Sequence, residues 1–334
     1  MKFWQRIGFY VESILILTVL CFSISSCKKT ETEADHPSQQ IILGFSQIGA
    51  ESAWRNQNTL SIQNAAEEAG IQLLFTNAEQ KQENQIRAIR SFIAYQVDVI
   101  AFVPIVTNGW DNVLREAKDA GIPVLVTDRQ IDIQDESLYA GSIGTDSVQA
   151  GRRAGLFLLE KFRNSTASAE DPIRIVELTG NVGSSVAIDR GVGFREIIEK
   201  DPRFEIIYSE SGDFLRSKGY ELMQSILNTY DDIDVLYSHN DSMTLGSLDA
   251  MTEKGINPGT DITIVSIDAE QAAINALQRG KVNCVIECNP KTGPEIMRLV
   301  KSLAAGEGIP RQIYVQEKVF REDDDLSDLE PRGY

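Results

Sequence analysis

Short β-rich runs alternate with helical stretches from residue 41 onward, and this alternation restricts the fold more than any other feature. In the first half the β-rich runs are 41–46, 72–76, 99–103, 123–127 and 139–143. Apolar side chains recur at helical spacing in residues 53–69, between the first and second runs, and in residues 82–95, between the second and third. Gly70 and Gly121 stand where helices should end. The pattern is typical of βαβ units and predicts a parallel sheet.

The same pattern restarts in the second half of the chain. Its β-rich runs are 173–178, 204–208, 235–238, 262–267 and 282–287. Helices are expected to begin near Ser185, Phe214, Ser242 and Gln271. A further helix over 295–305 and a β run over 313–319 follow. Two such sets of strands predict an α/β protein with two similar lobes.

The composition fits a globular protein and argues against nucleic acid as a partner. The 334 residues suffice for two domains, and 42% of them are hydrophobic. The formal net charge is -17, whereas phosphate binding needs clustered lysine and arginine. We therefore expect no nucleic-acid ligand.

The beginning of the chain has the pattern of an export signal. A positively charged start precedes a mostly apolar run over 14–24. The ending Ile24-Ser25-Ser26-Cys27 resembles the lipobox of bacterial lipoproteins, in which the cysteine is lipidated. A transmembrane anchor is the alternative, but the run is short for a span. We expect a signal peptide over 1–26, then lipidated Cys27 and a flexible tether over 27–40. The protein is then exported and lipid-anchored at the periplasmic or extracytoplasmic face of a membrane.

Two cysteines, Cys284 and Cys288, fall in the folded part of the chain. On one extended strand they would lie roughly 13 Å apart, too far for a disulfide. We expect two free, mostly buried thiols. No cysteine spacing resembles a zinc site, so we expect no metal.

Polar side chains follow most of the predicted strands. They occur in Glu51-Ser52-Ala53-Trp54-Arg55, Asp128-Arg129, Asp189-Arg190, Gly212-Asp213-Phe214 and His239-Asn240-Asp241, and at Asp268 and Glu287. Parallel sheets bind ligands at the carboxyl ends of their strands. Carboxylates, amides and guanidinium groups suit the many hydroxyls of a polyol, and the rings of Trp54 and Phe214 suit its C–H faces. Each residue alone could instead be a helix cap or part of a local ion pair.

Enzyme motifs are absent from the sequence. His239 is the only histidine after the tether, and no Gly-x-Ser-x-Gly elbow accompanies it. The sequence also has no phosphate-binding Gly-x-x-x-x-Gly-Lys-Ser/Thr loop. Asp128 and Asp268 could serve a glycosidase, but we expect nearby arginines to keep both ionised. We therefore expect no enzyme activity and no cofactor.

Several segments at these strand ends carry a family resemblance. They are Gly44-Phe45-Ser46-Gln47-Ile48-Gly49, Glu51 with Trp54-Arg55, Gln80-Lys81-Gln82-Glu83-Asn84-Gln85-Ile86, Asp128-Arg129, Ser185-Val186-Ala187-Ile188-Asp189-Arg190, Ser211-Gly212-Asp213-Phe214, His239-Asn240-Asp241 and the terminal Gly333-Tyr334. With them, the chain from Ile41 onward resembles the ribose/galactose-type periplasmic sugar-binding proteins of ABC importers, and most of all their galactofuranose-binding type.

The resemblance implies the periplasmic binding protein type I fold. That fold has two doubly wound parallel-sheet lobes joined by a three-segment hinge, with the ligand in the cleft between them. The N-terminal lobe would contain 41–145 plus 288–313, and the C-terminal lobe 146–287 plus 314–334.

The resemblance also implies which side chains hold the ligand. In the family the sugar is held by residues that match Glu51, Trp54, Arg55, Asp128, Arg129, Asn240 and Asp268. Arg190 matches the galactofuranose-type pattern, Phe214 matches a stacking aromatic residue, and Glu287 stands where ribose binders carry glutamine.

The implied function is import of a monosaccharide, a galactofuranose-like hexose or a related sugar. A monomeric receptor would deliver it to the permease subunits of an ABC transporter in the membrane. A sugar-sensing receptor that presents its ligand to a chemotaxis or kinase partner stays open as the alternative. LacI-type repressors share the fold, but they need a DNA-binding helix-turn-helix where this chain has a signal peptide.

Cys27→Ala should abolish lipidation, because it removes the thiol that would carry the acyl chains. We expect a radiolabelled fatty acid to be incorporated into the wild type and not into the variant. Cys21→Ala, within the apolar leader, is the matched control and should keep the label. A wild type that takes up no label would contradict the anchor.

Overall fold

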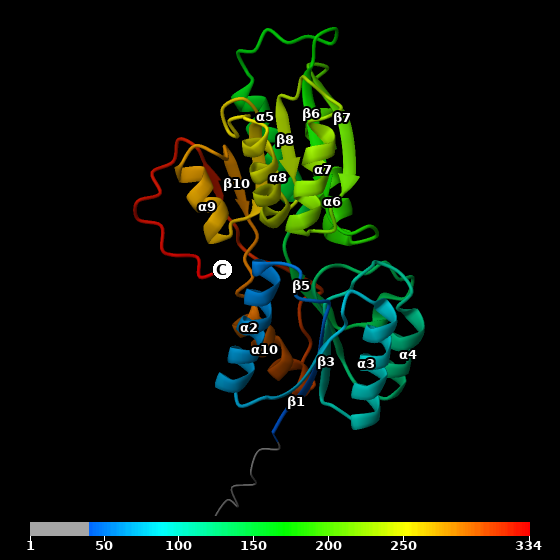
Figure 1. Ribbon diagram of the computed structural model, residues 1–334. Helices are drawn as coiled ribbons and strands as arrows, with labels where there is room; N and C mark the ends of the chain where they lie inside the picture. The colour runs from blue at the N-terminus through cyan, green and yellow to red at the C-terminus, as the bar shows by residue number, and fades with distance from the viewer. Residues whose placement is uncertain (1–39) are drawn as a thin grey trace, which may run out of the picture. The chain divides into compact units, whose positions relative to one another are not determined.

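The computed structural model describes residues 40–334, which form two six-stranded sheets with the same strand order (Figure 1). The first sheet has the order β11-β5-β4-β3-β1-β2, and the second has the order β12-β10-β9-β8-β6-β7. Each strand of one sheet therefore has a counterpart at the same position in the other. The predicted signal peptide, Cys27 and nearly all of the tether lie outside the described residues.

The strands follow the predicted β-rich runs closely. The first sheet contains β1 (Ile42–Gln47), β2 (Gln72–Asn77), β3 (Val99–Phe102), β4 (Val124–Asp128), β5 (Gly141–Gly144) and β11 (Gln312–Tyr314). The second contains β6 (Ile173–Thr179), β7 (Phe204–Ser211), β8 (Val235–Ser238), β9 (Thr263–Asp268), β10 (Cys284–Glu287) and β12 (Val319–Arg321). All pairings in the first sheet are parallel, and in the second only β12 runs antiparallel to its neighbour.

Helices cover both faces of each sheet. In the first lobe they are α2 (Ala53–Glu68), α3 (Gln82–Tyr95), α4 (Asp111–Asp119) and α10 (Gly293–Ala304), with a 3₁₀ turn η1 (Glu136–Leu138). In the second they are α5 (Ser147–Lys161), α6 (Ser185–Ile198), α7 (Arg216–Ile226), α8 (Asp241–Glu253) and α9 (Gln271–Gln278). Within residues 40–334, no helix combines the length and apolarity needed to cross a bilayer.

The alternation of side chains along each strand explains the two covered faces. In β3, Val99 and Ala101 pack into the core formed with α2 and α10, whereas Ile100 and Phe102 pack with α3 and α4 (Figure 1). In the second lobe, one core contains residues of α7, α8 and α9, and the other contains residues of α5 and α6. Each lobe is therefore a doubly wound α/β unit, as predicted.

The chain passes between the two sheets three times. It does so between β5 and α5, between β10 and α10, and between β11 and β12. The predicted single β run over 313–319 is wrong, because its two ends are short strands that belong to different sheets. We propose that the lobes divide as the sequence predicts after residues 145 and 287, whereas the predicted division after residue 313 falls inside β11 and moves to the segment between β11 and β12. The expectation that Cys284 and Cys288 are free and buried is confirmed.

Helices α5 and α6 pack closely because glycine residues stand at their contact. A Cβ atom on Gly151 would lie 2.1 Å from the carbonyl oxygen of Arg190, and one on Gly193 would lie 1.9 Å from that of Val148. Neither distance is tolerable, so the two backbones could not approach as they do with any larger residue.

Gly151→Ala should therefore lower the free energy of unfolding by about 1–3 kcal/mol, because the helices must separate to admit the methyl group. Urea denaturation measures the change. Gly308→Ala is the control, since a Cβ there meets no atom within 4 Å and its φ is not positive. Equal stability of both variants would show that the α5–α6 contact relaxes without cost.

Candidate ligand-binding site

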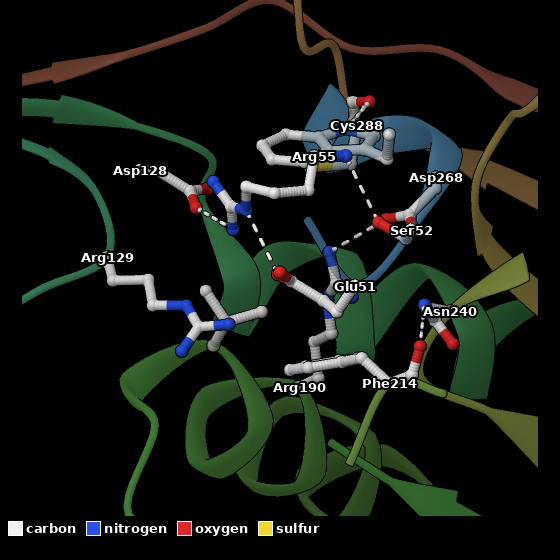
Figure 2. A pocket seen from close by; sticks show the side chains of 12 residues that line it. Glu51, Ser52, Arg55, Asp128, Arg129, Arg190, Phe214, Asn240, Asp268 and Cys288 are labelled. Carbon is white, nitrogen blue, oxygen red and sulfur yellow. Dashed lines mark hydrogen bonds and ion pairs between the residues drawn. The ribbon is translucent and has the colours of Figure 1, made fainter. Parts of the chain in front are cut away.

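Side chains from both lobes surround one cavity at the carboxyl ends of the parallel strands (Figure 2). They are Glu51, Ser52, Trp54, Arg55, Asp128, Arg129, Val186, Arg190, Phe214, Asn240, Asp268 and Cys288. The first six belong to the lobe of β1, the next five to the lobe of β6, and Cys288 to the crossing after β10. This is the edge at which α/β sheets bind their ligands.

In the first lobe, two carboxylates hold one arginine. Ser52 caps α2 by accepting a hydrogen bond from the backbone N–H of Arg55 at 3.0 Å, and this fixes the start of the helix beside the end of β4. Arg55 Nε donates to Glu51 Oε1 at 3.0 Å, and its Nη2 donates to Asp128 Oδ2 at 2.7 Å. Burial alone would lower the pKa of Arg55, but the two carboxylates outweigh it and raise that pKa.

The second lobe has a corresponding pair with a single carboxylate. Arg190 lies on α6 after β6, as Arg55 lies on α2 after β1, and Asp268 ends β9 as Asp128 ends β4. Arg190 Nη2 donates to Asp268 Oδ1 at 3.4 Å, and its Nη1 donates to the carbonyl oxygen of His239. The cavity thus has one buried arginine–aspartate pair on each side.

Both aspartates have unusual backbone conformations. Asp128 has φ 64° and Asp268 has φ 127°. Positive φ values are uncommon for residues other than glycine and cost conformational energy. The surrounding structure therefore fixes these two turns, which hold the carboxylates beside the arginines.

Two aromatic rings supply apolar surface, one from each lobe. Trp54 is only 6% exposed, and its Nε1 donates to the carbonyl oxygen of Cys288 at 2.6 Å. The Phe214 ring packs on Gly180, where a Cβ atom would lie 1.8 Å from it, so only glycine fits there. The Arg129 guanidinium group lies 5.6 Å from the centre of the Phe214 ring.

Several polar groups of the cavity have hydrogen-bonding capacity left over. Among residues 40–334, the buried atoms Glu51 Oε2, Arg129 Nε and Arg190 Nε have no hydrogen-bond partner. Buried polar atoms of this kind are normally paired. One acceptor, on Glu51, and two donors, on Arg129 and Arg190, are therefore available to bind a polar ligand. Asn240 is more fully engaged, because it caps α8 through Met243 N and donates to the carbonyl oxygen of Phe214.

Burial shifts the pKa of two charged groups of the cavity. Burial raises the pKa of Asp268 to about 8, although the charge of Arg190 opposes the rise and the carboxylate of Glu270 adds to it. Burial thus opposes the predicted ionisation of Asp268, which Arg190 favours. Burial also lowers the pKa of Arg129 to about 10, and Arg55 adds to that shift. Exclusion of water outweighs pairing at these two residues.

Nine of the ten predicted ligand-binding residues line this cavity, and Glu287 does not. Glu287 instead pairs with Arg332 and accepts the backbone N–H of Lys318 at 2.9 Å. The prediction missed Ser52, Val186 and Cys288. Ser52 and Cys288 lie in or beside the strand-end segments and could have been found, whereas no sequence signal distinguishes Val186.

His239 lies behind the cavity in a buried ion network. It is fully buried, and its Nε2 lies 3.1 Å from Glu177 Oε1. Glu177 also accepts hydrogen bonds from Arg195 and Ser209. Burial lowers the pKa of His239, so the neutral ring contributes to the core. The cavity's own groups suit the binding of a small hydroxylated molecule.

Comparison with known protein families identifies this fold and its relatives. The model of the periplasmic binding protein domain matches residues 43–308. The galactofuranose-binding protein YtfQ of Escherichia coli K12 is 43% identical over 265 residues, which are 78% of this chain and 81% of the relative.

Solved structures of sugar-bound proteins are also similar to this chain in sequence and fold. A protein from Mycobacterium smegmatis in complex with β-D-fucofuranose is 48% identical, with a TM-score of 0.82 over 84% of this chain and 91% of the other. The periplasmic binding protein of the arabinose ABC transporter from Shewanella sp. ANA-3, bound to α- and β-L-arabinofuranose, is 38% identical. Its TM-score is 0.80, over 84% of this chain and 92% of the other.

Asp268→Asn should change how stability depends on pH. In the wild type the folded-state pKa of about 8 lies above the usual value of 3.8, so the folded state binds the proton more tightly and loses stability as the pH rises toward 8. Asparagine does not titrate. The unfolding free energy of the variant minus that of the wild type should therefore increase by about 1–4 kcal/mol from pH 5 to pH 9.

Chemical denaturation at the two pH values measures this difference. The absolute stability of Asp268→Asn also reflects its altered bond to Arg190, so the change with pH is the informative quantity. Asp323→Asn, on the exposed surface, is the control and should show no such change. A constant difference for Asp268→Asn would mean that Asp268 stays ionised throughout.

Proposed function

The chain belongs to the family of periplasmic binding proteins, and from this we propose that it is the sugar-binding component of an ABC importer. The observation that carries the proposal is the buried arginine–aspartate pair in each lobe, Arg55 with Asp128 and Arg190 with Asp268. Such pairs present several charged donors and acceptors in fixed positions, which suits the adjacent hydroxyls of a monosaccharide. The rings of Trp54 and Phe214 would pack against its C–H groups.

We propose that the ligand is a monosaccharide in its five-membered ring form. The relatives described above are named for galactofuranose, or were solved with β-D-fucofuranose or L-arabinofuranose. These sugars share the furanose ring and differ in their substituents. The cavity residues supply donors on both sides of the ligand, and Trp54 and Phe214 contribute the apolar part of the cavity wall.

The proposed setting is the outer side of a cell membrane. Export and lipid attachment at Cys27 would keep the receptor beside its transporter, and the permease subunits of that transporter would be its partners. We expect the receptor to act as a monomer. The protein should release its sugar chemically unchanged, because His239 is engaged with Glu177 away from the cavity.

Wild-type protein should bind D-galactose, D-fucose or L-arabinose as the furanose. With D-galactose labelled with ¹³C at C1, the anomeric signal of the bound sugar should have the chemical shift of a furanose. Asp128→Ala should weaken binding by about 30- to 4,000-fold in isothermal titration, because it leaves Arg55 without one buried charged partner.

Asp323→Ala, on the exposed surface, is the matched control and should bind like the wild type. Circular dichroism should show that all variants stay folded. A bound pyranose would contradict the proposed ring form. A folded Asp128→Ala that binds normally would remove Asp128 from the site.

A further inference from the structure

Glu270 of the second lobe contacts the first lobe at the start of α2. Its Oε1 accepts the backbone N–H of Trp54 at 3.1 Å, and the side chain is only 3% exposed. Glu270 does not line the cavity, but Trp54 does. We infer that Glu270 is a positioning residue of the binding site, which holds Trp54 from the opposite lobe and stabilises the arrangement in which the lobes meet. This inference deepens the proposed function and rests on it.

Helix α2 lacks a negative charge of its own where Glu270 binds. Its first turn contains no acidic residue. Ser52 accepts the N–H of Arg55 through its side chain and that of Asn56 through its carbonyl oxygen, which leaves the N–H of Trp54 to Glu270. The N-terminus of a helix attracts an anion through its free N–H groups and its dipole. The second lobe therefore supplies the carboxylate that completes this helix start.

The turn that carries Glu270 is fixed from several directions. Asp268 and Ala269 both have positive φ, 127° and 64°, so the backbone turns sharply before Glu270. Asp241 Oδ2 accepts the N–H of Glu270 at 2.7 Å. On the other side, Arg332 Nε donates to the carbonyl oxygen of Ala269 at 3.2 Å. A strained turn persists only where its surroundings hold it, and here they direct Glu270 toward α2.

The burial of Glu270 is unfavourable unless α2 is in contact. Burial raises the pKa of Glu270, against hydrogen bonds from Trp54 N–H and Ser242 that lower it. The buried carboxyl groups of Asp241 and Asp268 lie close by, and the charge of Glu270 raises the pKa of both. Separation of the lobes would remove the Trp54 donor, so the contact favours the arrangement in which the lobes meet.

The other hydrogen bonds between the lobes involve different elements, and one of them is donated by Arg129 Nη2 to Asn181 Oδ1 at 3.3 Å. Thr107 N donates to the carbonyl oxygen of Gly183 at 3.1 Å, and Gln130 N donates to Ser185 Oγ at 2.8 Å. These bonds join the strand-end loops of the first lobe to the start of α6. Loss of the Glu270 bond would leave them in place and affect α2 and Trp54 specifically.

The test compares Glu270→Ala with Glu270→Gln, which keeps an oxygen that can accept the Trp54 N–H. Stopped-flow kinetics would use whichever of D-galactose, D-fucose and L-arabinose binds the wild type most tightly. The sugar should dissociate from Glu270→Ala roughly 10- to 150-fold faster than from the wild type, as expected for the loss of a hydrogen bond to a charged group. Its association rate constant should stay within about twofold of the wild-type value. For Glu270→Gln, which loses the charge but keeps an acceptor, the increase in the dissociation rate should be clearly smaller than for Glu270→Ala.

Glu205→Ala, at an exposed position of β7 in the same lobe, is the matched control and should bind like the wild type. Hydrogen exchange by mass spectrometry gives a readout without sugar: residues 53–56 should exchange faster in Glu270→Ala than in Glu270→Gln. If Glu270→Ala does not fold, sugar should still slow exchange of residues 53–56 in the wild type.

The two proposals fail in different ways. If the wild type binds none of the sugars, the proposed function is wrong, and the sugar-free exchange comparison still decides the role of Glu270. If the wild type binds sugar while Glu270→Ala dissociates at the same rate, the positioning role is overturned. An equal increase in the dissociation rate for Glu270→Gln and Glu270→Ala would also overturn it. The acceptor oxygen that glutamine shares with the wild-type glutamate would then have no effect.

Discussion

One buried arginine–aspartate pair in each lobe determines the geometry of the cavity. Arg55 and Asp128 lie 73 residues apart in the sequence, and Arg190 and Asp268 lie 78 apart. Each pair joins the helix after the first strand of its lobe to the end of the fourth strand. Because the two sheets have the same strand order, the two pairs connect corresponding positions, β1 with β4 in one lobe and β6 with β9 in the other. The site is thus built twice, once in each lobe.

These pairs are costly to bury, and the cost shows in the surrounding structure. Desolvation of an ion pair commonly exceeds its attraction, and apolar residues in its place often make a protein more stable. Here burial raises the pKa of Asp268 to about 8, and Asp128, Asp268 and Phe214 all have positive φ. Strain and uncompensated polarity gather at one edge of each sheet. That distribution is expected where stability is given up for ligand binding.

The sequence pattern predicts the strand ends well, and through them most of the cavity. Asp128 and Asp268 could be identified because polar residues after parallel strands meet at one edge. Glu287 follows a strand in the same way but turns to Arg332, 45 residues away, and no local pattern reveals that partner. The split of residues 313–319 between two sheets escaped prediction for a similar reason. Periodicity reports that a segment is extended, but which sheet it joins depends on tertiary contacts.

Pairing within each lobe also explains how the two lobes can separate. Among residues 40–334, every ion pair lies within one lobe, so separation of the lobes breaks none of them. The direct bonds between the lobes are hydrogen bonds, those of Thr107 with Gly183, Gln130 with Ser185, Arg129 with Asn181 and Trp54 with Glu270. Separation therefore breaks a few hydrogen bonds and leaves the arginine–aspartate pair of each lobe in place. A ligand that bonds both halves needs to order few side chains, so most of its interaction energy remains available to hold the lobes together.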